Sequence, residues 1–119
     1  MDIRLTETKD WMLLKQVRLA ALLDTPTAFG VNYQTAANYT DEQWKDRASS
    51  TGTAFWLAFD SDKPIGMIGA GVSSANRCNL IGMWIEAYAR GSGVAAQLVE
   101  AVKAHAMARG FDGVFLDVS

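Results

Sequence analysis

The chain has 119 residues, which is room for one compact domain, so we expect a single domain over residues 1–119. Its composition, 50% hydrophobic and 20% charged with two prolines, excludes a disordered tail and a collagen-like repeat. The net charge of −2 argues against a dedicated nucleic-acid binder, which needs a basic surface.

A short strand and a helix are expected at the start of the chain. Residues 3–6 alternate apolar and polar side chains, which is typical of a strand. Thr8 is expected to cap the helix that follows, and this helix ends before Pro26, because the residue preceding a proline avoids helical geometry. The apolar side chains on one face of this helix are Trp11, Leu14, Val17 (or Arg18), Ala21 and Leu22.

A second, shorter helix is predicted after residue 40. Thr40 and Gln43 match a capping box, in which each side chain accepts a hydrogen bond from the other residue's amide. The helix then continues through Trp44. Residues 29–39, between the two early helices, are expected to form a loop.

Three strands follow, joined by two turns. Residues 54–59 are aromatic and apolar, which favours a buried strand. Residues 60–64 contain Asp, Ser and Pro, which are typical turn formers. Residues 65–72 form the second arm of this hairpin, and the glycines in that arm suggest bulges. A turn at 74–76 leads to a third strand over 79–86.

The last part of the chain predicts a strand–helix–strand unit. Residues 87–93 lead to a helix over 94–109, which Gly110 ends in a left-handed conformation, and residues 113–118 form the final strand. The apolar stripe of this helix consists of Val94, Ala95, Leu98, Val99, Val102 and Ala106. Such a unit forms a right-handed parallel crossover, whereas the hairpins before it are antiparallel. We therefore expect an α/β fold with a mixed sheet and helices on its faces.

The turn between the third strand and this helix has the features of a phosphate site. Gly91 and Gly93 lack the Cβ atoms that would keep a bulky anion away from the backbone. The first amides of a helix have no intrahelical acceptor, and the helix dipole places about half a positive charge there. Arg90 adds a full charge beside the turn. The pattern favours a pyrophosphate site, with an ordinary glycine turn before a helix as the alternative.

The same segment carries a family resemblance. Residues 85–95, Ile-Glu-Ala-Tyr-Ala-Arg-Gly-Ser-Gly-Val-Ala, resemble motif A of the GNAT superfamily of N-acetyltransferases, Val-x-Pro-x-x-(Arg/Gln)-Gly-x-Gly-x-(Gly/Ala). Residues 11–30, 42–44 and 82–85 are similar to the corresponding parts of many bacterial members, and Ala87 departs from the motif, which has proline there. The resemblance covers nearly the whole chain and implies the GNAT-like acyl-CoA N-acyltransferase fold.

The resemblance implies acetyl-CoA (coenzyme A) as the cosubstrate. In the family, backbone amides of motif A bind the pyrophosphate, and on this chain they are those of Arg90, Gly91, Ser92, Gly93, Val94 and Ala95. The pantetheine arm pairs with the backbone of the preceding strand, here Met83, Trp84 and Ile85. An amide-rich arm binds such an exposed backbone edge as an added strand does.

The implied reaction is direct attack of a neutral primary amine on the acetyl thioester, catalysed by an N-acetyltransferase. It needs a base, a donor for the developing oxyanion and an acid for the thiolate. A backbone amide near Ile85 is the family-based oxyanion donor. Glu86 is the carboxylate nearest to the thioester region and the candidate base, with a solvated acid at a strand end as the alternative reading. The sequence does not distinguish a small amine, an antibiotic or a protein amino group as the acceptor.

Family members continue with a further helix and two closing strands that supply a tyrosine acid, so we expect a domain truncated after the fifth strand. Residues 114–116 would then lie at or near an uncovered sheet edge, and such an edge promotes association. The sequence accordingly predicts a homodimer formed through this strand.

Two other functional readings stay open. Residues 91–96 also fit the dinucleotide fingerprint G-x-G-x-x-A, with Asp117 roughly 20 residues further on, which would suit an NAD-binding domain. The second open interpretation is a non-catalytic acyl-CoA-binding or interaction module. Neither His105 nor Cys78 has partners at metal-ligand spacing, so no metal site is predicted.

The predicted location is the cytoplasm. No apolar run approaches the roughly 20 residues that a membrane span requires, and the first residues do not resemble a secretory signal. A single cysteine excludes an internal disulfide and fits a reducing compartment. We therefore expect no membrane partner and no nucleic-acid partner.

Overall fold

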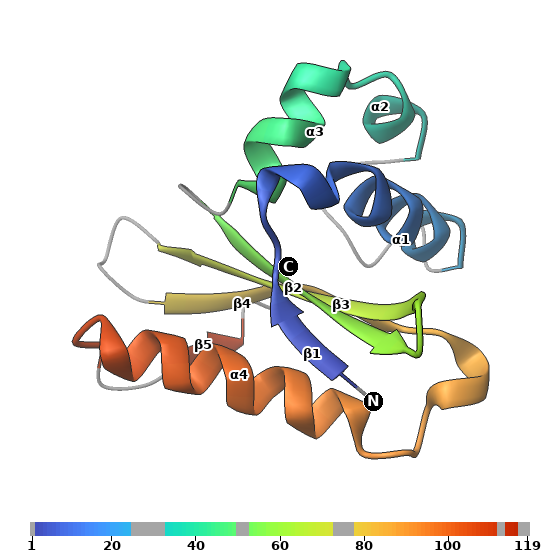
Figure 1. Cartoon of the computed structure of the whole chain (residues 1–119). Helices are drawn as coiled ribbons and strands as arrows, with labels where there is room; N and C mark the ends of the chain where they lie inside the picture. Colours follow the sequence, from blue (N-terminus) through green and yellow to red (C-terminus); the bar gives the residue numbers. More distant parts are fainter. Residues whose placement is uncertain (1, 25–32, 50–52, 73–77, 112–113, 117–119) are drawn as a thin grey trace.

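The computed structural model describes residues 2–24, 33–49, 53–72, 78–111 and 114–116. Within them one sheet runs in chain order through β1 (Asp2–Leu5), β2 (Ala54–Asp60), β3 (Lys63–Val72), β4 (Cys78–Ile85) and β5 (Val114–Leu116). The first four strands pair antiparallel, whereas β5 pairs parallel with β4 (Figure 1). The predicted parallel strand–helix–strand unit is therefore confirmed.

Helices cover both faces of the sheet. α1 (Trp11–Asp24), α2 (Tyr33–Ala37) and α3 (Asp41–Ala48) lie on one face, and α4 (Val94–Ala108) lies on the other (Figure 1). Two short 3-10 turns complete the described elements, η1 (Thr8–Asp10) before α1 and η2 (Ala87–Ala89) after β4. A mixed sheet between two helical layers is the predicted fold class.

The buried faces of the two long helices agree with the sequence pattern. In α1 the buried side chains are Leu14, Val17, Ala21 and Leu22. In α4 they are Val94, Leu98, Val102 and Ala106. The strand β2, between β1 and β3, is buried on both sides, because its side chains alternate between the core under α4, which Trp56 joins, and the core under α1 and α3, which Leu57 joins. The side chains of the apolar run at 54–59 thus pack alternately into the two cores.

The two predicted helix caps have different outcomes. Thr8 does not cap α1, because it lies inside η1, and Oδ2 of Asp10 instead accepts from the amide of Glu7 at 2.9 Å. At α3 the capping box is confirmed. Oγ1 of Thr40 accepts from the Gln43 amide at 3.1 Å, and Oε1 of Gln43 accepts from the Thr40 amide at 2.8 Å.

The loop expected over residues 29–39 contains a helix instead. α2 occupies Tyr33–Ala37, and its Ala36 is fully buried in the core under α1. Five residues make little more than one turn, which is too short to show a helical period in the sequence. The rest of this loop before residue 33 and the expected turn at 74–76 lie outside the described residues.

The β2–β3 hairpin is tighter than the turn predicted over residues 60–64. Asp60 pairs with Lys63, so only two residues connect the strands. Pro64, expected in the turn, lies in β3 opposite Phe59, where the register shifts. A proline is tolerated at such an irregularity because the regular ladder bond that its missing N–H would make is already interrupted.

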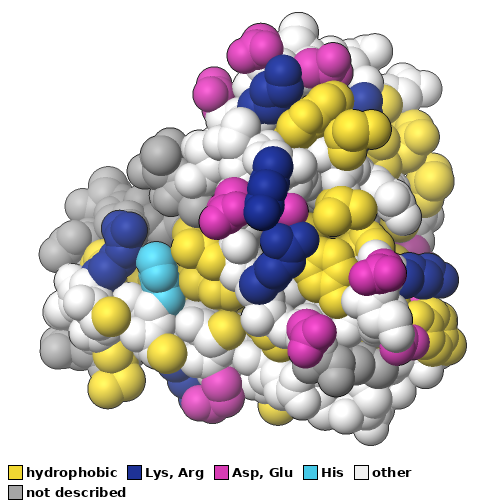
Figure 2. Space-filling model, viewed as in Figure 1, with side chains coloured by type: hydrophobic (Ala, Val, Ile, Leu, Met, Phe, Trp, Pro, Cys, Tyr) yellow, Lys and Arg dark blue, Asp and Glu magenta, His cyan; other side chains and the backbone are white. Residues whose placement is uncertain are grey.

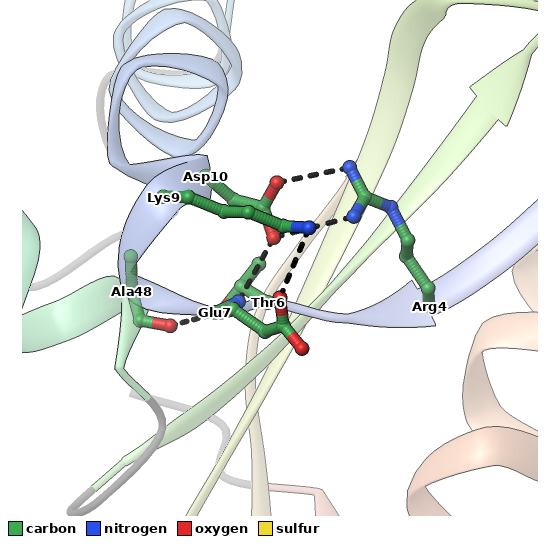
Figure 3. A network of polar contacts seen from close by, with 6 residues as sticks. All are labelled: Arg4, Thr6, Glu7, Lys9, Asp10 and Ala48. Atoms are coloured by element: carbon green, nitrogen blue, oxygen red, sulfur yellow. Dashed lines mark hydrogen bonds and ion pairs between the residues drawn. The ribbon is translucent and has the colours of Figure 1, made fainter.

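A polar network joins β1 to the helical layer (Figure 3). The carboxylate of Asp10 is almost fully buried, and it accepts hydrogen bonds from Nη2 of Arg4 and from the amide of Glu7, both at 2.9 Å. Oγ1 of Thr6 donates to the carbonyl oxygen of Ala48 at 2.8 Å. These contacts fix the end of β1 against η1 and the end of α3.

The surface shows no single basic area in the view of Figure 2, where acidic and basic side chains are interspersed around apolar ones. This distribution agrees with the small net charge. Among the described residues, no helix combines the length and the apolar character that crossing a bilayer demands.

Candidate functional site

The candidate site lies where β4 ends, around the connection from β4 to α4. This connection passes through Glu86, η2 and residues 90–93. Figure 1 shows it at one edge of the molecule, and the end of α1 reaches the same place, since Asp24 forms an ion pair with Arg90. The site therefore combines the predicted phosphate turn with a residue from the opposite end of the sequence.

The turn before α4 has a left-handed backbone at both glycines. The φ angles are +84° at Gly91 and +91° at Gly93, a region that favours glycine. A Cβ atom at either position would meet no other atom within 4 Å, so the space over the turn is open. Glycine is needed here for the backbone conformation, and no neighbouring atom crowds the position that a Cβ would take.

The amides of the turn divide into two groups. The amide of Arg90 donates to Ala87 at 3.3 Å and that of Ser92 donates to Ala89 at 3.2 Å, so these two belong to the η2 turn. The first intrahelical bond of α4 runs from Gln97 to Gly93. The amides that have no backbone acceptor among the described residues are those of Gly91, Gly93, Val94, Ala95 and Ala96. This second group is a set of free donors at a helix N-terminus.

The side chain of Arg90 turns away from the open turn. Its Nε donates to the carbonyl oxygen of Ile85 at 2.9 Å, and its Nη2 lies 2.6 Å from Oδ2 of Asp24. The same oxygen of Asp24 accepts from Nε1 of Trp84 at 2.9 Å. The hydrogen bond from Trp84, followed by that from Arg90, holds the pKa of Asp24 below its usual value. The charge that Arg90 was expected to add beside the turn is thus paired in this structure.

Asp24 is the site residue that the sequence analysis missed. It is the last residue of α1, and the negative end of the helix dipole disfavours a carboxylate there. An acid at a helix C-terminus therefore needs a partner, and this mismatch is the signal that the sequence contained. The partners themselves, Trp84 and Arg90, are 60 and 66 residues away in the chain.

A groove opens beside this network. It has a volume of about 340 Å³ and is lined by Ala20, Leu23, Asp24, Trp84, Glu86 and Ala87. Asp24 and Glu86 are the two charged residues in this lining, and both are acidic. Glu86 is half-buried directly after β4, and its amide donates to the carbonyl oxygen of Ile65 at 2.7 Å. Because Asp24 is paired with Arg90, the negative charge that the groove presents beside the end of β4 comes from Glu86.

Only part of the outer edge of β4, the edge away from β3, pairs with a described strand. Its first residues, Cys78 to Leu80, pair with β5, and its last two, Trp84 and Ile85, pair with β3 on the other side. Among the described residues β5 offers no partner to β4 beyond Leu80. The predicted pantetheine-binding residues, Met83 with Trp84 and Ile85, therefore lie on the stretch whose outer edge has no described strand beside it.

Three other chemically active side chains, those of His105, Cys78 and Tyr88, do not line the groove. His105 packs edge-on against Trp56, with ring centroids 5.0 Å apart, and Cys78 is buried in the core under α4. Tyr88 is exposed, and its hydroxyl donates to Asp60 at 3.3 Å. Asp117, on which the dinucleotide reading depended, lies outside the described residues.

Solved structures with the same fold are numerous. HMB0005, an aminoglycoside acetyltransferase from an uncultured soil metagenomic sample, is 16% identical with a TM-score of 0.78, over 99% of this chain and 79% of that one. AAC(6')-Iy, solved with the bisubstrate analogue CoA-S-monomethyl-acetylneamine, is 19% identical with a TM-score of 0.76, over 99% and 79%. A ribosomal-protein-alanine N-acetyltransferase from Brucella melitensis biovar Abortus 2308 is 14% identical with a TM-score of 0.72, over 100% and 81%.

These three likenesses show the fold, and because the proteins differ in the acceptor that they are named for, the fold alone does not select an acceptor. A comparison with curated proteins finds no sequence match. Residues 18–119, however, match the family model described as the acetyltransferase (GNAT) family. Since this match spans most of the chain, the chain belongs to the GNAT family of acetyltransferases.

Proposed function

We propose that this chain, as one domain over residues 1–119, binds acetyl-CoA and transfers its acetyl group to a primary amine. The observation that carries the proposal is the group of free amides at the start of α4, beside open space over two left-handed glycines. Donors arranged in this way suit a pyrophosphate, because both the N–H groups and the helix dipole favour an anion.

The coenzyme would use two parts of the site. Its pyrophosphate would accept from the amides of Gly91, Gly93, Val94 and Ala95, and those of Arg90 and Ser92 could join only by giving up their bonds to η2. Its pantetheine arm would lie along the backbone of Met83, Trp84 and Ile85, where β4 has no described neighbour on its outer side. An arm with amide groups matches such an edge.

The chemistry proposed is a direct transfer. The neutral amine nitrogen attacks the thioester carbonyl carbon, a C–N bond forms, and the C–S bond breaks as the CoA thiolate leaves. The amine must lose a proton, and Glu86, which lines the groove, is the proposed acceptor of that proton. A backbone amide near Ile85 is the proposed donor to the oxyanion that develops during the attack.

The groove suggests the charge of the acceptor. Asp24 is paired with Arg90, but Glu86 also lines the groove, and its negative charge would attract a molecule that carries ammonium groups before one of its amines loses its proton. Aminoglycosides, for which the similar proteins HMB0005 and AAC(6')-Iy are both named, belong to this class of compound. We therefore propose a cationic amine as the acceptor.

Calorimetric titration with acetyl-CoA, with NAD as the control ligand in the same buffer, tests the coenzyme site. Saturable binding of acetyl-CoA and no heat from NAD is the expected result. Binding of NAD alone would overturn the family-based assignment of the site. The appearance of free thiol when a cationic amine is added then tests catalysis, and tight binding without turnover would favour a non-catalytic acyl-CoA-binding module.

We also propose a cytoplasmic location and a homodimer. β5 has a strand neighbour on one side only within the described sheet, and an unpaired strand edge can pair with a second chain. Light scattering after size exclusion at micromolar concentration should give twice the mass of one chain. A clean monomer would contradict the dimer.

A further inference from the structure

The carboxylate of Asp24 joins the two parts of the proposed coenzyme site. Its Oδ2 accepts from Nε1 of Trp84 at 2.9 Å and lies 2.6 Å from Nη2 of Arg90. Trp84 belongs to the stretch of β4 proposed for the pantetheine arm, and Arg90 directly precedes the glycine turn proposed for the pyrophosphate. Asp24 therefore contacts both parts, whereas the proposed transfer gives it no chemical role.

The side chain of Arg90 closes the connection between β4 and the glycine turn. Its Nε donates to the carbonyl oxygen of Ile85, five residues earlier in the chain, at 2.9 Å. The amide of the next residue, Glu86, donates to the carbonyl oxygen of Ile65 in β3, so the first end of the connection is fixed to the sheet. The second end is held through the guanidinium of Arg90, which Asp24 contacts from the end of α1.

The members of this network are also held by other contacts. Leu22, two residues before Asp24, is fully buried, and Trp84 is 7% exposed in the same core under α1 and α3. Arg90 has its bond to Ile85. A half-exposed ion pair contributes little when both side chains are otherwise free, because ordering them costs entropy. Here the partners are already partly ordered, so the network fixes the connection at a smaller entropic cost.

The charge of Asp24 and its contacts predict opposite effects on coenzyme binding. Coenzyme A carries negative charges on its phosphate groups, so a nearby carboxylate repels it. Asp24 also pairs the guanidinium that the sequence pattern places beside the pyrophosphate. If the charge alone mattered, removing the carboxylate would tighten binding. If its contacts hold the turn in the arrangement that binds, removing it would weaken binding.

We propose that Asp24 is a positioning residue of the coenzyme site, which fixes the glycine turn through Arg90 and the end of β4 through Trp84. This inference rests on the proposed binding of acetyl-CoA. Free amides at the start of α4 bind an anion only when they are held in the arrangement that it needs, and the affinity falls with the fraction of chains that have this arrangement. The contacts outweigh the repulsion, because Arg90 neutralises the carboxylate.

Calorimetric titration of the full chain with acetyl-CoA tests this role. Asp24→Ala should weaken binding by roughly tenfold, the effect expected when about one chain in ten has the competent turn. Asp24→Asn keeps an acceptor for Trp84, so its affinity should lie between those of Asp24→Ala and the wild type. Circular dichroism checks that each variant is folded at the temperature of the titration. An affinity at or above that of the wild type in folded Asp24→Ala or Asp24→Asn would overturn the inference.

Asp62→Ala is the matched control, because it changes the net charge by the same amount. Asp62 lines a different groove, beside β1, and does not line the one beside β4. The control should bind acetyl-CoA as the wild type does, or slightly more tightly. A loss equal to that of Asp24→Ala would show that the network around Asp24 is not the cause.

A double-mutant cycle tests the route through Arg90. Arg90→Gln should weaken binding by itself, and adding Asp24→Ala should then cost much less than it does in the wild type, because the two side chains act together. Losses that multiply fully would contradict an action of Asp24 through Arg90.

Spectra of the ¹⁵N-labelled chain without ligand separate this inference from the proposed function. The amide signals of Gly91 and Gly93 should move or broaden in Asp24→Ala and stay in place in Asp62→Ala. Signals that do not move in Asp24→Ala, in a chain that binds acetyl-CoA, would refute the positioning role alone. A wild-type chain that does not bind acetyl-CoA would refute the proposed function, and the role of Asp24 in binding with it.

Discussion

Gly93 and Asp24, two residues of the candidate site, differ in whether neighbouring residues in the sequence explain why that residue type is needed. Gly93 is explained by its own backbone, whose φ of +91° lies in the region that other residues avoid. Asp24 is explained only by its contacts, since Trp84 and Arg90 both bond its Oδ2. The first can be predicted from a glycine pattern, whereas the second depends on where the end of α1 meets the end of β4.

Gly93→Val should abolish coenzyme binding and leave the fold largely intact. A branched side chain in a left-handed conformation costs roughly 1–2 kcal/mol, and its methyl groups would occupy the open space over the turn. Calorimetry with acetyl-CoA and thermal unfolding measure the two effects. Gly71→Ala is the control, because its new Cβ would have only an ordinary contact, 3.8 Å from Thr53. Undiminished affinity in Gly93→Val would refute the phosphate site.

Asp24→Asn should isolate the charge of the Asp24 carboxylate, because an amide oxygen can still accept from Trp84. The pKa of Asp24 is lowered in the folded chain, so its contribution to stability is present above the unfolded pKa near 4 and is lost as the pH falls through the folded pKa. The variant should melt slightly below the wild type at neutral pH and low salt. The difference should shrink in acid and in high salt, and identical melting curves in all conditions would contradict the ion pair.

At the scale of elements, the two predicted helix caps show which helix starts can be predicted from neighbouring residues alone. Thr40 caps α3 because the capping box lies within four residues of sequence. Thr8 does not cap α1, because the buried carboxylate of Asp10 accepts the amide of Glu7 and a 3-10 turn forms first. Asp10 takes this position because Arg4 of β1 pairs with it, which is a tertiary contact.

Thr40→Ala should lower the free energy of unfolding by about 1 kcal/mol, since the substitution removes the side-chain acceptor at the start of α3. Urea unfolding followed by circular dichroism measures this loss. Glu42→Ala is the control on the same turn, because its contact with Lys45, at 3.5 Å on the surface, contributes little. Equal losses in the two variants would show that the cap is not what stabilises α3.

At the scale of the whole molecule, helices cover both faces of the sheet, and the pKa of His105 depends on its burial at one of these faces. It packs against Trp56 of β2, in the layer between α4 and the sheet. Burial, and then the charge of Arg109, lower the pKa of His105 from its usual value. The folded chain therefore favours the neutral imidazole more strongly than the unfolded chain does.

This shift gives a pH dependence of stability. Between the folded pKa and the unfolded value of about 6.5 the unfolded chain binds more protons, so stability should fall as the pH drops through this window and level off below it. His105→Gln should remove that part of the dependence. Urea midpoints of both proteins across this range measure the effect, and parallel curves would contradict it.

The sequence by itself determined the order of the elements, the fold class and the glycine turn before α4, because each depends on side-chain periodicity or backbone preference over a few neighbouring residues. It missed α2, whose five residues are too few to show a helical period, and it misplaced Pro64. Tertiary structure alone decided the network of Asp24, Trp84 and Arg90. Asp24 lies 60 residues from Trp84 and 66 from Arg90 in the chain, and only the packing of α1 on the sheet brings them within reach of one another.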